Sequence, residues 1–177
     1  MPTVYVGMGS NVDPQRHVAR ALEALERTFG SLQVSSVYQT PAVGFEGDDF
    51  LNLVVAFRTR LPVSAVVERL RQIEAQHGRH RGDGRYAPRT LDLDLLLYGD
   101  LIAHHDGISV PRDEIEHHAF VLCPLAELAG ERRHPRLGRT FTELWDEMRD
   151  GAQPLRRVEI ASAQPARGGA EDGGLSY

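Results

Sequence analysis

The sequence of 177 residues contains no lysine, and all 20 of its basic residues are arginines. This absence excludes chemistry that needs a lysine amine, such as Schiff-base formation, and it excludes the lysine-containing phosphate loop. A bound phosphate would have to be held by arginine, by backbone amides or by a metal ion. Codon bias explains the same composition without any function, so only the positions of the arginines can indicate a phosphate site.

Cysteine and long apolar runs are also scarce. Cys123 is the single cysteine, so no disulfide can form within the chain, which suits a reducing compartment. No stretch approaches the roughly 20 apolar residues of a membrane span, and no basic leader precedes the first apolar run. We therefore expect a soluble cytoplasmic protein with no membrane partner.

Basic residues are outnumbered, because the chain has 25 acidic and 20 basic residues and so a formal net charge of −5. A nucleic-acid binder presents a basic field to the phosphate backbone, so we expect no nucleic acid partner. A chain of this length can bury roughly 70% of its unfolded surface without a staple. We expect one domain over residues 1–150, in a monomer. Residues 151–177, rich in Ala, Gly, Pro, Gln and charge, are expected to form a disordered tail.

The spacing of apolar residues predicts alternating strands and helices. Strands are expected over residues 3–8, 32–39, 50–58 and 91–98. Asp13 is expected to cap a helix that begins at Pro14 and ends at Gly30. A second helix is expected between Pro62 and Gly78.

The C-terminal part is predicted to be helical. Pro124 is expected to bend or break a helix over residues 117–128, and Thr140 with Glu143 forms a capping box for a last helix through Met148. The resulting order, β-α-β-β-α-β followed by helices, predicts an α+β fold, a ferredoxin-like sandwich with an antiparallel-rich sheet.

The strongest chemical signal is the pair Asp92 and Asp94 in the strand expected over residues 91–98. Alternate residues share a face of a strand, so the two carboxylates project together. The opposite face, toward the core, is expected to hold Leu91, Leu93, Leu95 and Leu97. The Cα atoms of the aspartates would lie roughly 7 Å apart. Magnesium suits such a pair, because it binds carboxylate oxygens and leaves positions for phosphates. A solvated strand face is the alternative, although aspartate is depleted in strands.

An arginine-rich loop is expected directly before this strand. Its basic residues are Arg79, Arg81, Arg85 and Arg89. Arginine presents a planar fork of donors to phosphate oxygens, so metal ions and arginines together suit a polyphosphate. Taken alone, the loop could equally be a solvated basic segment.

Three further patterns are weaker. The run Gly7-x-Gly9-Ser10-Asn11 could form a nucleotide turn, but it lacks the glycines and lysine of the firm motifs, and a plain tight turn explains it as well. Asn52 could read the edge of a heterocycle, and Phe50 and Phe120 could stack on a ring, although each taken singly is better explained as core. No firm zinc spacing occurs among His104, His105, His117 and His118, so no zinc is expected.

Together these segments resemble the 6-hydroxymethyl-7,8-dihydropterin pyrophosphokinases of folate biosynthesis. The resemblance covers about residues 3–130. It rests on Gly9-Ser10-Asn11, Ser36-Val37-Tyr38-Gln39-Thr40-Pro41, Phe50-Leu51-Asn52, Glu74 with Gly78-Arg79-x-Arg81, Pro88-Arg89-Thr90-Leu91-Asp92-Leu93-Asp94, and Val110-Pro111 followed by Phe120. It implies an enzyme that transfers pyrophosphate from ATP to the pterin and releases AMP.

The resemblance also implies residue roles. Asp92 and Asp94 would hold two magnesium ions that bridge the ATP phosphates, and Arg79 and Arg89 would contact phosphates and help the transfer. The pterin, sandwiched by the two phenylalanines, would be bound by Thr40, Pro41, Val43, Phe50, Asn52 and Phe120. The ATP side would comprise Glu74, Arg81, Leu95, Ser109, Val110, Arg112 and His118, with Arg81 in a loop that closes over the site.

The nucleotide side departs from the family pattern, whereas the pterin side is nearly intact. Tyr86 replaces a tryptophan, Gly107 a basic residue, Ser109 a threonine, Arg112-Asp113 a histidine-tyrosine pair, and His118 an arginine. We hypothesise that the guanidinium has moved, so that Arg112 supplies the phosphate contact that His118 does not supply in full.

Two other functions stay open from the residues alone. One is a different magnesium-dependent transferase or phosphohydrolase on the same scaffold, which would share the two aspartates. The other is a non-enzymatic ferredoxin-like binding module, against which the acidic charge and the aspartates in a strand argue. The first of these would have no use for Thr40, Phe50, Asn52 and Phe120 as a set.

Overall fold

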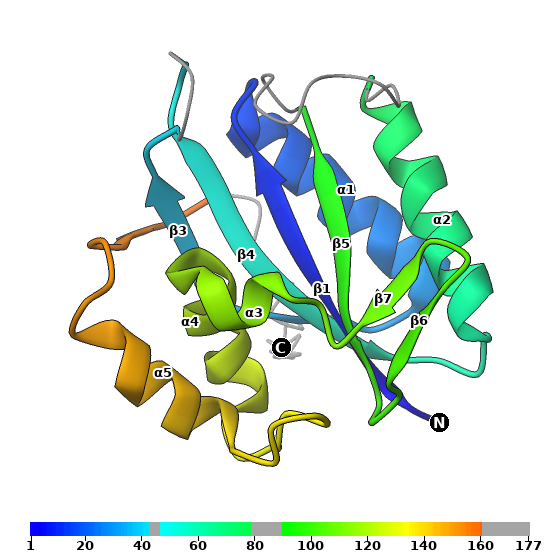
Figure 1. The fold of residues 1–177 in the computed structure, drawn as a ribbon. Helices are drawn as coiled ribbons and strands as arrows, with labels where there is room; N and C mark the ends of the chain where they lie inside the picture. The colour runs from blue at the N-terminus through cyan, green and yellow to red at the C-terminus, as the bar shows by residue number, and fades with distance from the viewer. Residues whose placement is uncertain (43–46, 79–89, 161–177) are drawn as a thin grey trace, which may run out of the picture.

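The computed structural model describes residues 1–42, 47–78 and 90–160, and Figure 1 shows them as a sheet with helices on both faces. The antiparallel sheet has six strands: β1 (Thr3–Ser10), β2 (Gln33–Val34), β3 (Val37–Thr40), β4 (Phe50–Arg58), β5 (Asp92–Tyr98) and β8 (Arg156–Val158). A separate hairpin pairs β6 (Ala103–His105) with β7 (Ile108–Val110). The helices are α1 (Pro14–Phe29), α2 (Val63–Gln76), α3 (Glu114–His117), α4 (Ala119–Ala129) and α5 (Phe141–Arg149).

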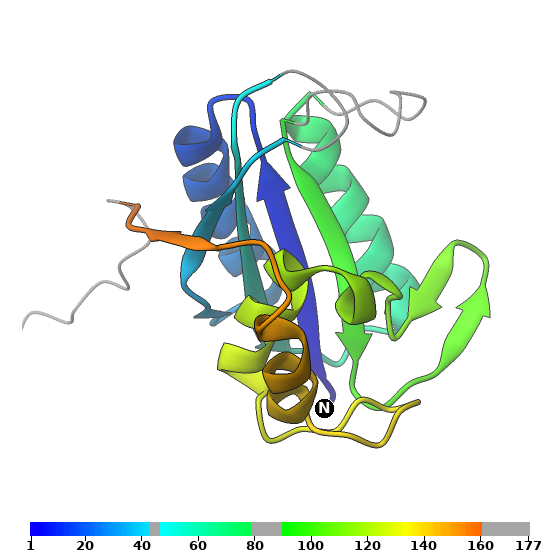
Figure 2. The same ribbon diagram turned by 60° about the vertical axis from the view of Figure 1, so that its left-hand side comes forward.

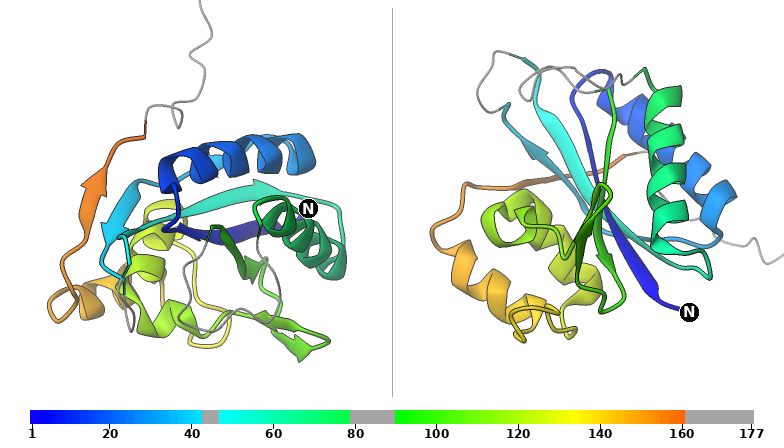
Figure 3. Two further views of the ribbon diagram at one scale, coloured as in Figure 1. Left: turned by 90° about the horizontal axis from the view of Figure 1, so that it is seen from above. Right: turned by 45° about the vertical axis from the view of Figure 1, so that its right-hand side comes forward.

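The strand order β5-β1-β4-β3-β8 confirms the predicted ferredoxin-like arrangement, with β8 added at one edge and β2 paired to β4. Figure 3 shows three layers, in which α1 and α2 cover one face of the sheet and α4 and α5 lie against the other. None of the helices in the described ranges is both long and apolar enough to cross a membrane.

Two apolar clusters hold the layers together, one on each face of the sheet. Along β4, Leu51 and Leu53 belong to the cluster under α1 and α2, whereas Val54 and Ala56 belong to the cluster under α4 and α5. This alternation is the period of a strand buried on both faces. The apolar stripe predicted for α1 is buried as expected, at Val18, Ala21, Leu22 and Leu25.

Two strand predictions need correction. The strand expected over residues 32–39 is divided into β2 and β3, because Ser35 bonds to Val54 through both its backbone N–H and its side-chain hydroxyl. Leu97 packs in the cluster under α4 with Leu96, not in the cluster of Leu91 and Leu93. The register between β1 and β5 shifts there, and such an irregularity exchanges the faces of the residues that follow.

Three helix predictions had different outcomes. The helix start at Pro14 is confirmed, but Asp13 has a left-handed φ of 42° and makes no side-chain cap. Pro124 does not break α4, which is continuous and buries Pro124 in its packed face. The cap of α5 is confirmed, since Thr140 Oγ1 accepts a hydrogen bond from Glu143 N at 3.1 Å.

The fold also extends beyond the predicted boundary at residue 150. The strand β8 pairs with β3 through Val37↔Val158 and Gln39↔Arg156, as Figure 2 shows at the sheet edge. Ile160, only 6% exposed, joins the first apolar cluster. The folded domain therefore reaches at least residue 160, while residues 161–177 of the expected tail lie outside the described residues.

Candidate active site

Asn52, Asp92 and Asp94, three of the predicted site residues, lie near the end of the sheet where β1 ends and β4 and β5 begin (Figure 1). The strand register places Gly9 opposite Asn52 on one side and opposite Asp92 on the other. The next row toward the centre places Gly7 opposite Asp94. Three neighbouring strands therefore bring an amide and two carboxylates, which were predicted separately from the sequence, to the same end of the sheet.

These polar side chains share the face that α4 covers. Leu51, Leu53 and Leu93 belong to the cluster on the opposite face, so the residues between them alternate to the α4 side. Phe120 belongs to the first turn of α4, the helix that lies on this face of the sheet (Figure 3). Two glycines on β1, Gly7 and Gly9, leave bare backbone between the amide and the carboxylates.

Gly9 is the tighter of these two positions. A Cβ atom at Gly9 would lie 3.1 Å from Asn52 Oδ1 and 4.0 Å from the Cβ of Asp92. A Cβ at Gly7 would make only ordinary contacts of 3.5 Å with Leu96. The sequence predicted a turn at Gly9, whereas the structure places Gly9 in β1 between Asn52 and Asp92.

The expected pterin side contains a fixed amide. Asn52 is 8% exposed, and its Nδ2 donates a hydrogen bond of 2.8 Å to Thr40 Oγ1. This bond sets the orientation of the amide, with Oδ1 toward Gly9. Phe50 and Phe120 are both half-buried, and Pro41 directly follows β3. The His118 ring stacks on Phe120, with centroids 4.9 Å apart and planes 18° apart, so it joins an aromatic residue of the pterin side.

Two hydrogen bonds connect α4 to β3 and to the segment just before β3. Glu127 accepts a hydrogen bond from the Tyr38 hydroxyl and a second one, of 2.9 Å, from Ser36 N. Burial raises the pKa of Tyr38, and hydrogen bonds to Cys123 and Glu127 raise it further, so the hydroxyl keeps its proton and donates. Phe120, Cys123 and Glu127 are spaced to share one face of α4.

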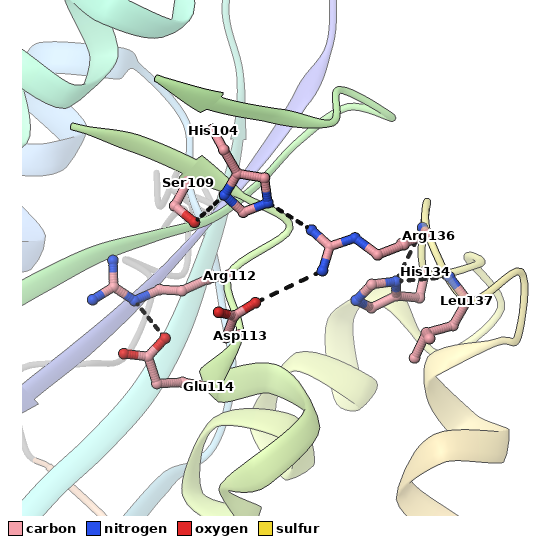
Figure 4. A network of polar contacts seen from close by, with 8 residues as sticks. All are labelled: His104, Ser109, Arg112, Asp113, Glu114, His134, Arg136 and Leu137. Atoms are coloured by element: carbon pink, nitrogen blue, oxygen red, sulfur yellow. Dashed lines mark hydrogen bonds and ion pairs between the residues drawn. The ribbon is translucent and has the colours of Figure 1, made fainter. Parts of the chain in front are cut away.

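The expected metal side pairs one aspartate with an arginine. Arg112 NH2 lies 3.4 Å from Asp94 Oδ1, and its buried Nε lies 3.0 Å from Glu114 Oε2, which is the distance of an ion pair without the geometry of a hydrogen bond. Figure 4 shows the guanidinium above Glu114. At the entry to β5, Ser10 Oγ donates a hydrogen bond of 2.5 Å to Thr90 O, which ties the end of β1 to the start of the aspartate strand.

The two carboxylates have the chemistry of ligands that magnesium uses. Within the described ranges no three His, Cys, Asp or Glu side chains are grouped as metal ligands. Magnesium is typically held by one or two carboxylates together with substrate phosphates and water, so Asp92 and Asp94 are a sufficient protein contribution.

The expected ATP side lies along the outer edge of β5. Glu74 Oε2 accepts a hydrogen bond of 3.1 Å from Leu93 N, while Leu95 and Val110 are buried in the core. The Ser109 hydroxyl is 3.0 Å from His104 Nδ1. These residues come from α2, β5 and β7, which are in mutual contact.

Arg71 lies beside Gly107, where the sequence is expected to depart from the family pattern. Its NH2 would be 2.8 Å from a Cβ at Gly107, so this α2 guanidinium occupies the space next to the hairpin turn. Arg136, in the loop after α4, contacts His104 of this hairpin at 3.0 Å and Asp113, the residue before α3, at 3.7 Å (Figure 4).

Several predicted residues lie outside the described part of the chain. They are Val43 of the pterin set and the loop residues Arg79, Arg81, Arg85, Tyr86 and Arg89. Conversely, Glu114, Glu127 and Arg71 were not predicted. They come from separate elements, and no spacing in the sequence marks them as neighbours of the site.

The sequence profile of the family described as 7,8-dihydro-6-hydroxymethylpterin-pyrophosphokinase, or HPPK, matches residues 5–130. The chain belongs to this family. An HPPK of Pseudomonas aeruginosa is 39% identical over 145 residues, which are 80% of this chain and 88% of that protein. An HPPK of Aquifex aeolicus is 34% identical over 137 residues, 76% of this chain and 85% of the relative.

Solved HPPK structures show the same fold. A triple mutant of Plasmodium falciparum HPPK-DHPS superposes with a TM-score of 0.68 at 13% identity, covering 88% of this chain. The wild-type protein with pterin and p-hydroxybenzoate gives a TM-score of 0.67 at 15% identity. This HPPK spans only 46% and 44% of those two chains, so the likeness concerns the fold of one part of them.

Proposed function

We propose that this HPPK transfers the pyrophosphoryl group of ATP to 6-hydroxymethyl-7,8-dihydropterin, a step of folate biosynthesis. The observation that supports it most is the row Asn52–Gly9–Asp92, which sets a fixed amide beside a carboxylate pair across bare backbone. A transferase that used only a nucleotide would have no need of the amide or of the aromatic residues around it.

The bond changes follow from the substrates. The hydroxymethyl oxygen of the pterin attacks the β-phosphorus of ATP, a new O–P bond forms there, and the hydroxyl proton is released to solvent. The bond between that phosphorus and the oxygen bridging to the α-phosphate breaks, so AMP leaves with the bridging oxygen. Bound magnesium would neutralise the phosphate charge and orient the phosphates.

The residues of this chain would position the two substrates. Asp92 and Asp94 would hold the metal ions, two in number. Asn52, fixed by Thr40, would read the pterin edge, and Phe50 and Phe120 would stack on the ring, with Pro41 and Val43 beside it. Arg79 and Arg89 would contact the phosphates. The ATP side would comprise Glu74, Arg81, Leu95, Ser109, Val110, Arg112 and His118, with Arg81 in the closing loop.

The setting proposed for this chemistry is the cytoplasm. The single cysteine suits a reducing compartment, and the net charge of −5 does not favour nucleic acid as a partner. The proposed partners are therefore the two small-molecule substrates, bound to a monomer.

The nucleotide product tests this function directly. With magnesium, ATP and the hydroxymethyl-dihydropterin, chromatography should show AMP and pterin diphosphate in equal amounts. ADP as the nucleotide product would indicate an ordinary kinase, and free pyrophosphate in place of the pterin diphosphate would indicate a phosphohydrolase. Either outcome rejects pyrophosphoryl transfer.

Substitutions of the carboxylates test the same proposal. Asp92→Ala or Asp94→Ala should lower kcat/KM by at least about a hundredfold, or roughly 2.7 kcal/mol. Asp100→Ala, just beyond the far end of β5, is the matched control and should leave activity near wild type. Unfolding curves of all three variants should resemble that of the wild type.

A further inference from the structure

Arg112 lies between two carboxylates that come from different elements. Its backbone N–H donates a hydrogen bond of 3.0 Å to Leu96 O, which fixes the residue beside β5. From there the side chain reaches Asp94 Oδ1 with NH2 at 3.4 Å and Glu114 Oε2 with Nε at 3.0 Å. One guanidinium thus joins a carboxylate of the proposed metal pair to a carboxylate of α3.

The contact with Asp94 cannot coexist comfortably with a metal ion on the same carboxylate. A divalent ion bound to Asp94 would stand within a few ångströms of the guanidinium, and charges of one sign at that distance repel strongly away from bulk water. The contact with Glu114 does not have this conflict, because Glu114 is not one of the paired strand carboxylates. Metal binding therefore favours the arginine on Glu114 alone.

We propose that Arg112 is an internal counter-ion for Asp94 that metal and nucleotide displace together. In the free chain the guanidinium neutralises Asp94. When the metal binds, the NH2 end leaves Asp94 while Nε stays on Glu114, and the released N–H groups turn to the phosphates. This proposal rests on the pyrophosphokinase function proposed above, and it adds a coupling between metal and nucleotide.

Glu114 is a positioning residue in this arrangement. It holds the guanidinium at the site after Asp94 has been released, so that the arginine exchanges one anion for another without leaving. Removal of Glu114 would leave Arg112 with Asp94 as its carboxylate partner among the described residues, which strengthens the competition with metal. The two substitutions Arg112→Gln and Glu114→Gln are therefore expected to act in opposite directions.

Binding of Mn²⁺ without nucleotide tests the first half of the proposal. Electron paramagnetic resonance titration should show Arg112→Gln binding Mn²⁺ about fivefold more tightly than the wild type, the size typical of a half-exposed ion pair. Glu114→Gln should bind Mn²⁺ more weakly than the wild type. Arg136→Gln is the matched control, since it removes an arginine that pairs with Asp113 and His104 and should change nothing.

Binding of a nucleotide analogue tests the second half. Isothermal titration with α,β-methylene-ATP and Mg²⁺ should show about tenfold weaker binding to Arg112→Gln, the loss typical of a charge-assisted hydrogen bond. Arg112→Lys keeps the positive charge on a shorter side chain, so its affinity for the analogue should lie between those of the wild type and Arg112→Gln. If Arg112→Gln does not melt like the wild type, Arg112→Lys takes its place in the comparison.

The outcomes separate this proposal from the function itself. If Arg112→Gln binds Mn²⁺ no more tightly than the wild type, or if neither chain binds it, Arg112 is not a counter-ion that competes with metal. AMP formation would then still support the pyrophosphokinase function. If Mn²⁺ binding tightens but the product is ADP, the counter-ion role stands and the proposed reaction is wrong.

Discussion

Gly9 has no side chain, and this leaves space between two predicted site residues. It lies between Asn52 and Asp92, and a Cβ there would stand 3.1 Å from Asn52 Oδ1. Asn52 has little freedom to move away, because its Nδ2 is bonded to Thr40. The space above Gly9 is therefore reserved by the backbone and not merely left over from packing.

Gly9→Ala is expected to raise the KM for the pterin about tenfold, since displacing Asn52 costs roughly one hydrogen bond. Gly7→Ala is the matched control on the same face of β1, because its Cβ would meet Leu96 at an ordinary 3.5 Å. Steady-state kinetics on both variants decides the matter. An equal effect of the two substitutions would show that strand packing, not the row with Asn52, is responsible.

His134 makes stability depend on pH. It is 1% exposed, and its Nδ1 accepts hydrogen bonds of 3.1 Å from the backbone N–H groups of Arg136 and Leu137. Its Nε2 has no hydrogen-bond partner within the described part of the chain. Burial lowers the pKa of His134 below its usual 6.5. The folded state thus favours the neutral ring.

The sign of the effect follows from this lowered pKa. Below pH 6.5 the unfolded chain takes up the proton before the folded chain does, so the free energy of unfolding falls with falling pH. Thermal melts at pH 7.5 and 5.5 should show a smaller loss of Tm for His134→Gln than for the wild type. His105→Gln, at an exposed position of the β6–β7 hairpin, should keep the full wild-type loss.

The sequence predicts which residues share a face where one strand presents them together. Asp92 and Asp94 follow from the period of two, and the structure places Asn52 in the same row. Glu114 could not be predicted in this way, because its relation to Asp94 depends on how the chain returns after the hairpin. The hypothesis that Arg112 supplies the phosphate contact that His118 does not supply in full stays a prediction. In the structure Arg112 contacts Asp94, whereas His118 lies against Phe120.

Between elements, the hydrogen bond from Tyr38 to Glu127 joins the strand that ends at Thr40 to the helix that begins beside Phe120. These two residues belong to opposite walls of the proposed pterin pocket. The bond lies two residues from Thr40 and two helical turns from Phe120. We therefore expect this bond to position the two walls without contacting the substrate.

Tyr38→Phe is expected to lower stability by about 1 kcal/mol, the usual net value of one hydrogen bond, and also to weaken pterin binding several-fold. Tyr98→Phe removes a comparable bond, from the Tyr98 hydroxyl to Leu61 O at 2.5 Å, at the other end of the sheet. It should lower stability without changing pterin affinity. Calorimetry and titration with the pterin compare the two variants, and a matching loss of affinity in both would contradict a positioning role.

The β6–β7 hairpin was missed although a short sequence pattern marks it. Asp106 and Gly107 have positive φ values of 51° and 76°, as the two central residues of a tight hairpin turn require. The flanking strands have three residues each, too short for a clear alternation. The division of the strand at Ser35 had no such marker, because it depends on hydrogen bonds to Val54 far along the chain.

The complete fold depends on a strand that composition assigned to a tail. Residues 151–160 are polar on average, but β8 pairs with β3 and Ile160 is buried. Average composition hides such a strand, because three paired residues and one buried side chain hardly alter it. Long-range pairing decided the boundary, and local sequence could not.

Removal of β8 is expected to destabilise the protein. A chain ending after Ala152 loses the pairing with β3 and the burial of Ile160, and a fully buried isoleucine side chain alone contributes about 1.5–3 kcal/mol. A chain ending after Ile160 is the matched control. Differential scanning fluorimetry should show a lower Tm only for the shorter chain. Equal Tm values for both would mean that β8 adds nothing to stability.

The sheet has β8 as one edge strand and β5, the strand of the two aspartates, as the other. The unpaired N–H and C=O groups of an edge strand can pair with a strand of another chain, and such pairing is one cause of aggregation. Here the Glu74 carboxylate accepts from Leu93 N, and the backbone N–H of Arg112 donates to Leu96 O. Residues expected to serve the nucleotide thus also block strand addition, so losing them would threaten solubility as well as catalysis.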